Sequence, residues 1–104
     1  MRKISPQDFS GSRAWEAMEI ERFSGETTVR LHWTDQPYKW HVNDGPEVFV
    51  VLDGAVDMHA RENGAVVVHR LLPGDIFHAT EGDAHVAHPI GAVRVLVIER
   101  AGSI

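Results

Sequence analysis

The chain has 104 residues, of which 43% are apolar and 24% are charged, and its formal net charge is -5 at pH 7. This length accommodates one domain with its own core, and the negative charge balance, without a cluster of Lys and Arg, argues against a nucleic-acid partner. The lack of cysteine excludes a disulfide framework and a thiolate nucleophile, and no apolar run is long enough to span a membrane.

The N-terminal part of the chain is the hardest to assign. Ser12–Phe23 is compatible with a helical turn followed by a strand, or with one long strand, because so short an apolar run has no decisive period. Thr27–Trp33 predicts a further strand after a turn at Ser24-Gly25.

From residue 41 onward, turn signals recur every eight to ten residues. Asp-Gly and Asn-Gly pairs supply the positive φ angles that tight hairpin turns need. The signals are Asp44-Gly45, Asp53-Gly54, Asn63-Gly64, Pro73-Gly74, Gly82-Asp83 and Gly91. The valine-rich segments between them predict strands at Glu47–Leu52, Ala55–Ala60, Ala65–Leu72, Asp75–Ala79, His85–His88 and Ala92–Glu99. Short strands at this spacing predict an all-β fold, an antiparallel sandwich or barrel.

Polar side chains stand at the start of two of these strands. His41 and Asn43 point the same way because strand side chains alternate between faces. Glu47 begins an apolar strand and shares a face with Phe49, and a carboxylate buried there needs a partner or a metal ion. His85 begins another strand, so two imidazoles and a carboxylate on facing strands could hold a divalent metal.

This spacing resembles the two motifs of the cupin superfamily, which are small jelly-roll barrels that hold a metal or ligand inside. The matching residues are His41, Glu47 and Gly54 for the first motif, and Gly74, Gly82 and His85 for the second. The resemblance implies an antiparallel jelly-roll β-barrel in a single-domain, RmlC-like cupin. It also implies a homodimer, because small members of the family commonly pair through sheet edges and exchanged terminal strands, and exposed strand edges need covering in any case.

The chain departs from the motifs in several places. Asp35, Thr80 and Pro89 replace a glycine, a proline and an asparagine of the family pattern, and Asn43 stands where a second histidine ligand is usual. The resemblance therefore implies His41, Glu47 and His85 as ligands of iron, zinc, manganese or nickel. Asn43 is then a tentative fourth ligand or the hydrogen-bond partner of a metal-bound water. The competing interpretation is a metal-free barrel in which these four side chains bond one another.

The aromatic residues near His41 suggest a pocket. Trp33, Tyr38 and Phe49 are candidate wall residues for a small-molecule site, and Trp40 better fits packing at the barrel mouth or a dimer contact. We expect residues 1–104 to form one cytoplasmic domain, with an N-terminal strand or arm over 1–24 and the barrel over 27–99.

Three functional hypotheses follow from this site. The first is a metal-dependent enzyme that acts on a small polar molecule, with the metal as Lewis acid or oxygen activator. The second is a metal-free isomerase or epimerase with His41 or His85 as general base. The third is a non-catalytic protein that binds or senses a small molecule.

Overall fold

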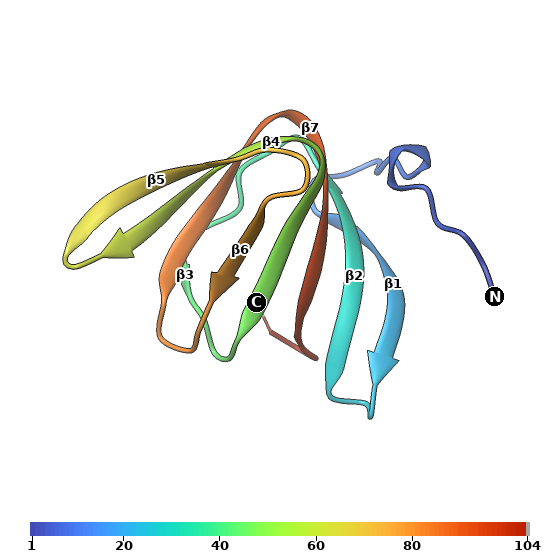
Figure 1. The fold of residues 1–104 in the computed structure, drawn as a ribbon, viewed down its shortest axis with the longest axis horizontal. Coiled ribbons are helices and arrows are strands. Elements are labelled where there is room, and N and C mark those ends of the chain that lie inside the picture. The colour runs from blue at the N-terminus through green and yellow to red at the C-terminus, as the bar shows by residue number, and fades with distance from the viewer. Residues whose placement is uncertain (104) are drawn as a thin grey trace.

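The computed structural model describes residues 1–103 and consists almost entirely of antiparallel β-strands (Figure 1). The elements are the 3-10 turn η1 (Pro6–Asp8) and the strands β1 (Glu16–Phe23), β2 (Thr27–Thr34), β3 (His41–Val42), β4 (Glu47–Glu62), β5 (Ala65–Leu71), β6 (Ile76–Ala79) and β7 (Ala84–Arg100). The all-β prediction is confirmed. None of the helical structure in residues 1–103 has the length and hydropathy needed to cross a membrane.

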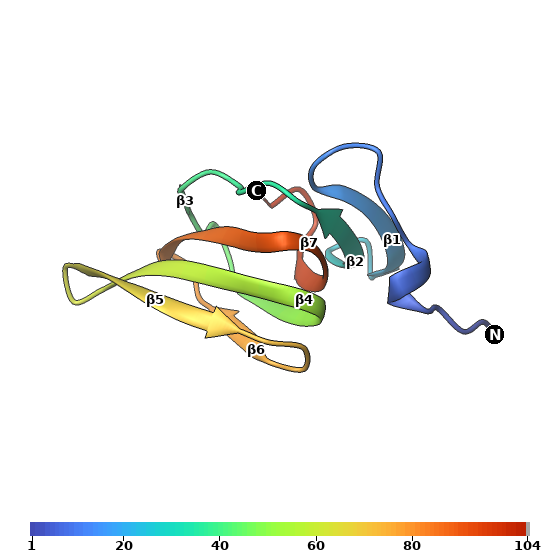
Figure 2. The same cartoon turned by 90° about the horizontal axis from the view of Figure 1, so that it is seen from above.

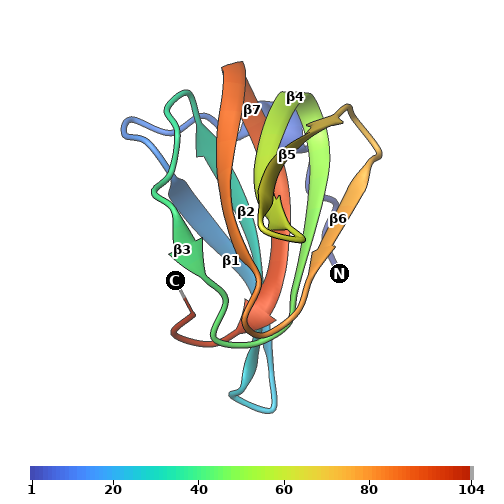
Figure 3. The same ribbon diagram turned by 90° about the vertical axis from the view of Figure 1, so that its left-hand side faces the viewer.

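Two long strands, β4 and β7, run through the whole molecule and pair with each other along both their halves. The first half of β4 and the second half of β7 are flanked by β6 and by β2, and β1 is added outside β2. Their other halves are flanked by β5 and β3. The sheet curls on itself as a result, and its inner face encloses the core (Figures 2 and 3). This is the predicted jelly-roll barrel.

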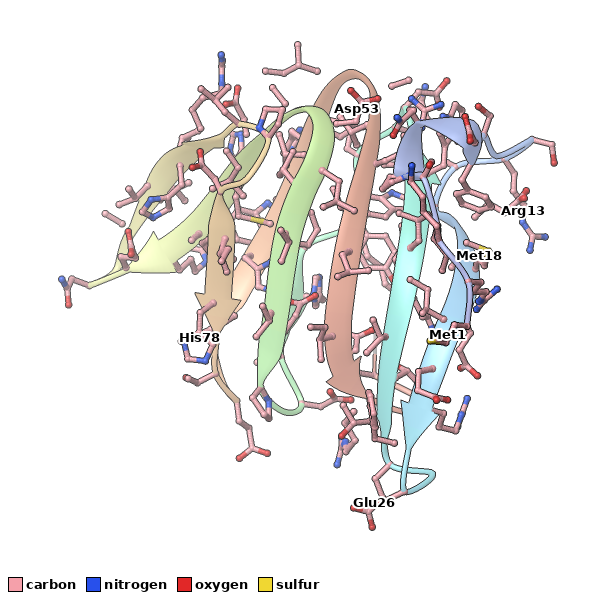
Figure 4. All side chains as sticks on the ribbon, turned by 45° about the vertical axis from the view of Figure 1, so that its right-hand side comes forward. Met1, Arg13, Met18, Glu26, Asp53 and His78 are labelled. Carbon is pink, nitrogen blue, oxygen red and sulfur yellow. The ribbon has the colours of Figure 1, made fainter. Side chains whose placement is uncertain are left out.

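The predicted turn at Asp53-Gly54 is instead a bend inside the continuous strand β4, so Glu47–Leu52 and Ala55–Ala60 are one strand. The pairing with β7 shifts register on both sides of Asp53, which is the mark of a β-bulge. Asp53, at the top of the barrel in Figure 4, is paired with Arg94 of β7. Nη1 of Arg94 lies 2.7 Å from Oδ2 of Asp53. Gly91 likewise lies within β7.

The other predicted turns do join strands: Asp44-Gly45 lies between β3 and β4, Pro73-Gly74 between β5 and β6, and Gly82-Asp83 between β6 and β7. Two more have backbone angles typical of tight turns. Asn63 and Gly64 both have positive φ angles, 52° and 80°, and form the two-residue loop between β4 and β5. Ser24 and Gly25, with φ angles of 52° and 70°, lie in the turn between β1 and β2, which ends at Glu26 in Figure 4.

The N-terminal segment matches, in part, the first alternative that the sequence allowed, a helical turn followed by a strand. A turn precedes β1, as in the turn-then-strand alternative, but it is not helical. Residues before it run beside the sheet, where the guanidinium of Arg94 donates hydrogen bonds to the Phe9 carbonyl (2.8 Å) and the Ser10 hydroxyl (2.9 Å). These bonds attach the first ten residues to β7.

The core lies between the curled halves of the sheet. Because side chains alternate along each strand, most inward positions of β4 and β7 are apolar and most outward positions are partly exposed. The buried cluster consists of Phe49, Val51, Val56, Met58, Leu71, Ala87, Val93, Val95 and Val97. This cluster fills the middle of the barrel. The inward position at the start of β4 is polar, because Glu47 occupies it.

The edge strand β5 carries exposed valines. Val66 and Val68 have exposed fractions of 49% and 51%, and β5 pairs only with β4 among the described strands. The homodimer expected through sheet edges stays a prediction.

Candidate metal centre

The structure brings together the three side chains that the sequence singled out as metal ligands. His41 on β3 stands directly opposite His85 on β7, and the centroids of their rings are 4.5 Å apart. Glu47 enters the same space from the start of β4. One potential ligand atom from each residue lies within 4.8 Å of the other two.

Asn43 is the fourth member of this cluster and bonds two of the others. Its Oδ1 lies 2.7 Å from Nε2 of His85, and its Nδ2 donates to Oε1 of Glu47 at 3.4 Å. Nε2 of His85 is also 3.1 Å from Oε1 of Glu47. Backbone hydrogen bonds to Gly82 and Asp83 hold Asn43 against the turn that precedes β7. All three side chains of this network are buried.

The hydrogen bond of His41 defines its tautomer. Nδ1 of His41 lies 3.0 Å from the carbonyl oxygen of Lys39. A carbonyl only accepts hydrogen bonds, so Nδ1 carries the proton of the neutral ring and Nε2 keeps its lone pair. A backbone carbonyl behind the ring is the usual partner of a metal-binding histidine.

The spacing within the cluster fits a divalent ion. Two ligand atoms at right angles around one ion, each about 2.1 Å from it, lie about 3 Å apart. The distance of 3.1 Å between Nε2 of His85 and Oε1 of Glu47 matches that value. The potential ligand atoms of all three residues lie within 4.8 Å of one another, so the side chains would move slightly closer together around an ion. Nδ1 of His85 is buried and has no hydrogen-bond partner among residues 1–103.

A cavity of about 250 Å³ opens beside the cluster. Tyr38 and Phe49 line it, as the sequence suggested. An edge-to-face series of rings runs along one wall: Trp15 and Tyr38 have centroids 5.3 Å apart, and Tyr38 and His41 have centroids 5.4 Å apart. The full set of lining residues is Trp15, Arg30, His32, Tyr38, His41, Glu47, Phe49, Met58, His85, Ala87, Val97, Glu99 and Ser103.

Trp33, the third expected wall residue, does not line this cavity. It follows His32 on β2, and His32 occupies the inward position, so Trp33 points to the other face. Its ring lies beside Gly11, where an added Cβ would come within 2.8 Å of Trp33 Cε3. The tryptophan that does line the cavity is Trp15, which has a positive φ of 59° just before β1.

The lining residues to which the sequence analysis assigned no role include Trp15, Arg30, His32 and Glu99. The sequence could have indicated Glu99 as a cavity residue. It has the same strand parity as Val95 and Val97, so its carboxyl lies on an inward face that is otherwise apolar. Arg30 and His32 share the inward face of β2 by the same alternation. Trp15 has no comparable signal, since it lies in a turn.

Burial changes the ionisation of two lining residues. It raises the pKa of Glu99 to about 7, with the nearby charge of Glu47 acting in the same direction and Arg30 opposing it. Burial also lowers the pKa of His32, and a hydrogen bond to the backbone of Trp15 partly opposes this. At neutral pH the cavity therefore contains an uncharged His32 and a partly protonated Glu99.

The remaining histidines do not join the cluster. His59 and His88 lie on the outer face of β4 and β7, as expected from alternation, with ring centroids 4.2 Å apart. His78 on β6 points away from the barrel interior (Figure 4). These residues provide controls for the metal site.

Comparisons with known proteins support the fold. No family model and no curated protein sequence matches the chain. Among solved structures, a cupin-2 domain protein from Shewanella frigidimarina has a TM-score of 0.75 and 20% identity, with 86% of this chain and 84% of that chain covered. A cupin superfamily protein from Desulfitobacterium hafniense has a TM-score of 0.77 and 13% identity, with 91% of this chain and 85% of that chain covered.

A metal-containing enzyme is also similar in structure. The cobalt(II) form of HppE in complex with substrate has a TM-score of 0.70 and 14% identity, with 85% of this chain covered. The chain spans about half of HppE, 54% of its length. Together with the curled antiparallel sheet, these similarities establish that the chain has the cupin fold.

Proposed function

We propose that this protein binds a divalent metal ion through His41, Glu47 and His85 and binds or transforms a small polar molecule in the adjoining cavity. The observation that carries the proposal is the convergence of three ligand atoms within 4.8 Å on the inner face of the barrel. Two imidazoles and one carboxylate suit iron(II), zinc, manganese or nickel and leave positions open for a substrate.

Different hydrogen bonds orient the three proposed ligands. The Lys39 carbonyl holds His41 in the tautomer whose Nε2 is free to bind. Asn43 hydrogen-bonds both Glu47 and His85 and so keeps these two side chains close together. With a metal held by His41, Glu47 and His85, the Asn43 amide would be available to hydrogen-bond a further ligand of the ion. A bound metal would supply Lewis-acid chemistry or oxygen activation.

The cavity supports a small ligand. Its volume of about 250 Å³ is below the range typical of drug-sized ligands, so the space suits a small molecule. Aromatic side chains shield part of the wall, while Glu99 and Arg30 provide polar groups. The metal bound by HppE, a structural neighbour, is consistent with a metal in this fold but belongs to a chain of 14% identity.

Metal content measured after incubation with each metal and dialysis tests the proposal. Wild-type protein should retain near-stoichiometric metal, and His85→Ala should lose it because two ligands hold an ion far more weakly than three. His88→Ala is the matched control, since His88 lies on the same strand but outside the barrel, and it should retain the metal. Wild-type protein without metal after exposure to iron, zinc, manganese and nickel would contradict the proposal.

A metal-free acid–base function is the second candidate, and the hydrogen bonds within the cluster favour it. Nε2 of His85 is already engaged by Asn43 and Glu47, whereas Nε2 of His41 carries a lone pair. His41 would therefore be the general base. This alternative predicts that solvent deuterium enters a keto-sugar or keto-acid in metal-free wild-type protein and that His41→Gln stops the exchange. No exchange with any tested compound would remove it.

A further inference from the structure

A pair of opposite charges lies at one end of the cavity, beside the cluster. Thr28 of β2 pairs with Glu99 of β7, and Arg30 pairs with Val97, so Arg30 and Glu99 are diagonal neighbours on adjacent strands. Long side chains at such positions reach one another. Both side chains line the cavity, and Glu99 is also the direct pairing partner of Glu47.

Within residues 1–103, the Arg30 guanidinium and the Glu99 carboxyl keep hydrogen-bonding capacity that protein groups do not occupy. The guanidinium of Arg30 has one long ion pair, with Nε 3.9 Å from Oε1 of Glu19. Oγ1 of Thr28 donates a hydrogen bond to the backbone carbonyl oxygen of Glu99 at 3.3 Å, so this bond does not engage the Glu99 carboxyl. A half-buried carboxyl and a guanidinium in one cavity therefore have donors and acceptors to offer a ligand.

The charge of the cavity indicates which ligand these groups fit. Glu47 and Glu99 are the acidic side chains among its lining residues, and Arg30 is the basic one. A divalent ion at the cluster would leave the cavity with one excess positive charge when both carboxyls are ionised. A ligand with one negative charge complements this balance.

We propose that Arg30 and Glu99 select a small hydroxy acid: Arg30 binds the carboxylate and Glu99 accepts a hydrogen bond from the neighbouring hydroxyl. An arginine fork matches a carboxylate, and a glutamate accepts from a hydroxyl. The apolar side chains of Phe49, Met58 and Val97 then contact the carbon skeleton. This assignment rests on the proposed function, because the excess positive charge comes from the metal.

Three probes of nearly equal size test this assignment by calorimetric titration of metal-loaded protein at pH 8. Lactate has both groups, propionate lacks the hydroxyl, and lactamide lacks the charge. Lactate should bind about tenfold more tightly than either of the others, since each loses one hydrogen bond of the charge-assisted kind.

Variants assign each preference to its residue. Arg30→Gln should abolish the preference for lactate over lactamide, and Glu99→Leu should abolish the preference for lactate over propionate. Glu99→Gln, which retains an acceptor oxygen, should keep part of the second preference. Arg22→Gln and Glu21→Gln, on β1 outside the cavity lining, are the matched controls and should keep both preferences.

The outcomes distinguish this inference from the metal centre. Wild-type protein that binds metal but binds the three probes equally, or not at all, overturns the hydroxy-acid assignment and leaves the metal centre intact. Preferences that survive in Arg30→Gln and Glu99→Leu also overturn it. Wild-type protein that takes up no metal overturns the metal centre, and the same three titrations on that protein then decide the roles of Arg30 and Glu99 separately.

Discussion

Oδ1 of Asn43 lies 2.7 Å from Nε2 of His85, and this contact ties the one unusual residue of the cluster to one of its candidate ligands. The side chain of Asn43 therefore faces the space that a metal would share with His41, Glu47 and His85. An amide oxygen is a weaker donor than imidazole for zinc or iron, so position 43 limits the affinity of the site.

Asn43→His should tighten metal binding by about tenfold or more, because it adds an imidazole on the same face as His41. Competition with a metal-binding dye measures the change. Asn63→His, in the exposed β4–β5 turn, is the control and should have no effect on this site. Unchanged affinity for Asn43→His would show that position 43 does not face the metal.

Glu99 should make stability depend on pH. Its pKa rises from 4.5 to about 7 on folding, chiefly through burial, so the native state holds this proton more tightly than the unfolded state. The stabilisation that comes from this tighter proton binding is fully present below about pH 4.5, where Glu99 is protonated in both states. It is lost as the pH rises from there through about 7. After discounting for solvent screening of a half-buried group, the loss is about 1–2 kcal/mol.

Urea unfolding of metal-free wild-type and Glu99→Gln protein between pH 4.5 and 8 measures this contribution. The variant should gain stability relative to wild type across the interval, because the amide cannot ionise. A difference that stays constant with pH would show that Glu99 titrates normally.

The bend of β4 depends on Gly54. Its φ is +81°, and an added Cβ would lie 2.7 Å from the Ala92 carbonyl oxygen and 2.8 Å from Cγ1 of Val93. Gly54→Ala should therefore combine backbone strain with a steric clash and cost about 3 kcal/mol of unfolding free energy. Gly64→Ala is the matched control, because Gly64 has a φ of +80° with open space around it, and it should cost about 1 kcal/mol. Equal losses in chemical denaturation would contradict this role for the close contact.

The fold was predictable because two local signals agree along the chain. Valine-rich alternation marks the strands, and Asn63-Gly64 has the composition of the tight turn that it forms. The same Asp-Gly signal misled at Asp53-Gly54, since a glycine with positive φ serves a bulge as well as a hairpin. Only the pairing of Asp53 with Arg94, distant in sequence, distinguishes the two cases.

The site was predictable where alternation and motif spacing applied, and less so elsewhere. His41, Glu47 and His85 stand at strand starts whose faces follow from the period of two. Trp33 was assigned to the cavity by its proximity to His41 in sequence, although its neighbour His32 holds the inward position. Trp15 reaches the cavity from a turn with a positive φ, a conformation that the sequence does not signal for tryptophan.

A metal-edge anomalous difference map from a crystal soaked in zinc tests the account most directly. Zinc held by the three proposed ligands should give one strong peak about 2.0–2.2 Å from Nε2 of His41, from Nε2 of His85 and from a carboxylate oxygen of Glu47. A map without a peak inside the barrel, or with zinc bound only at the outer pair His59 and His88, would contradict it.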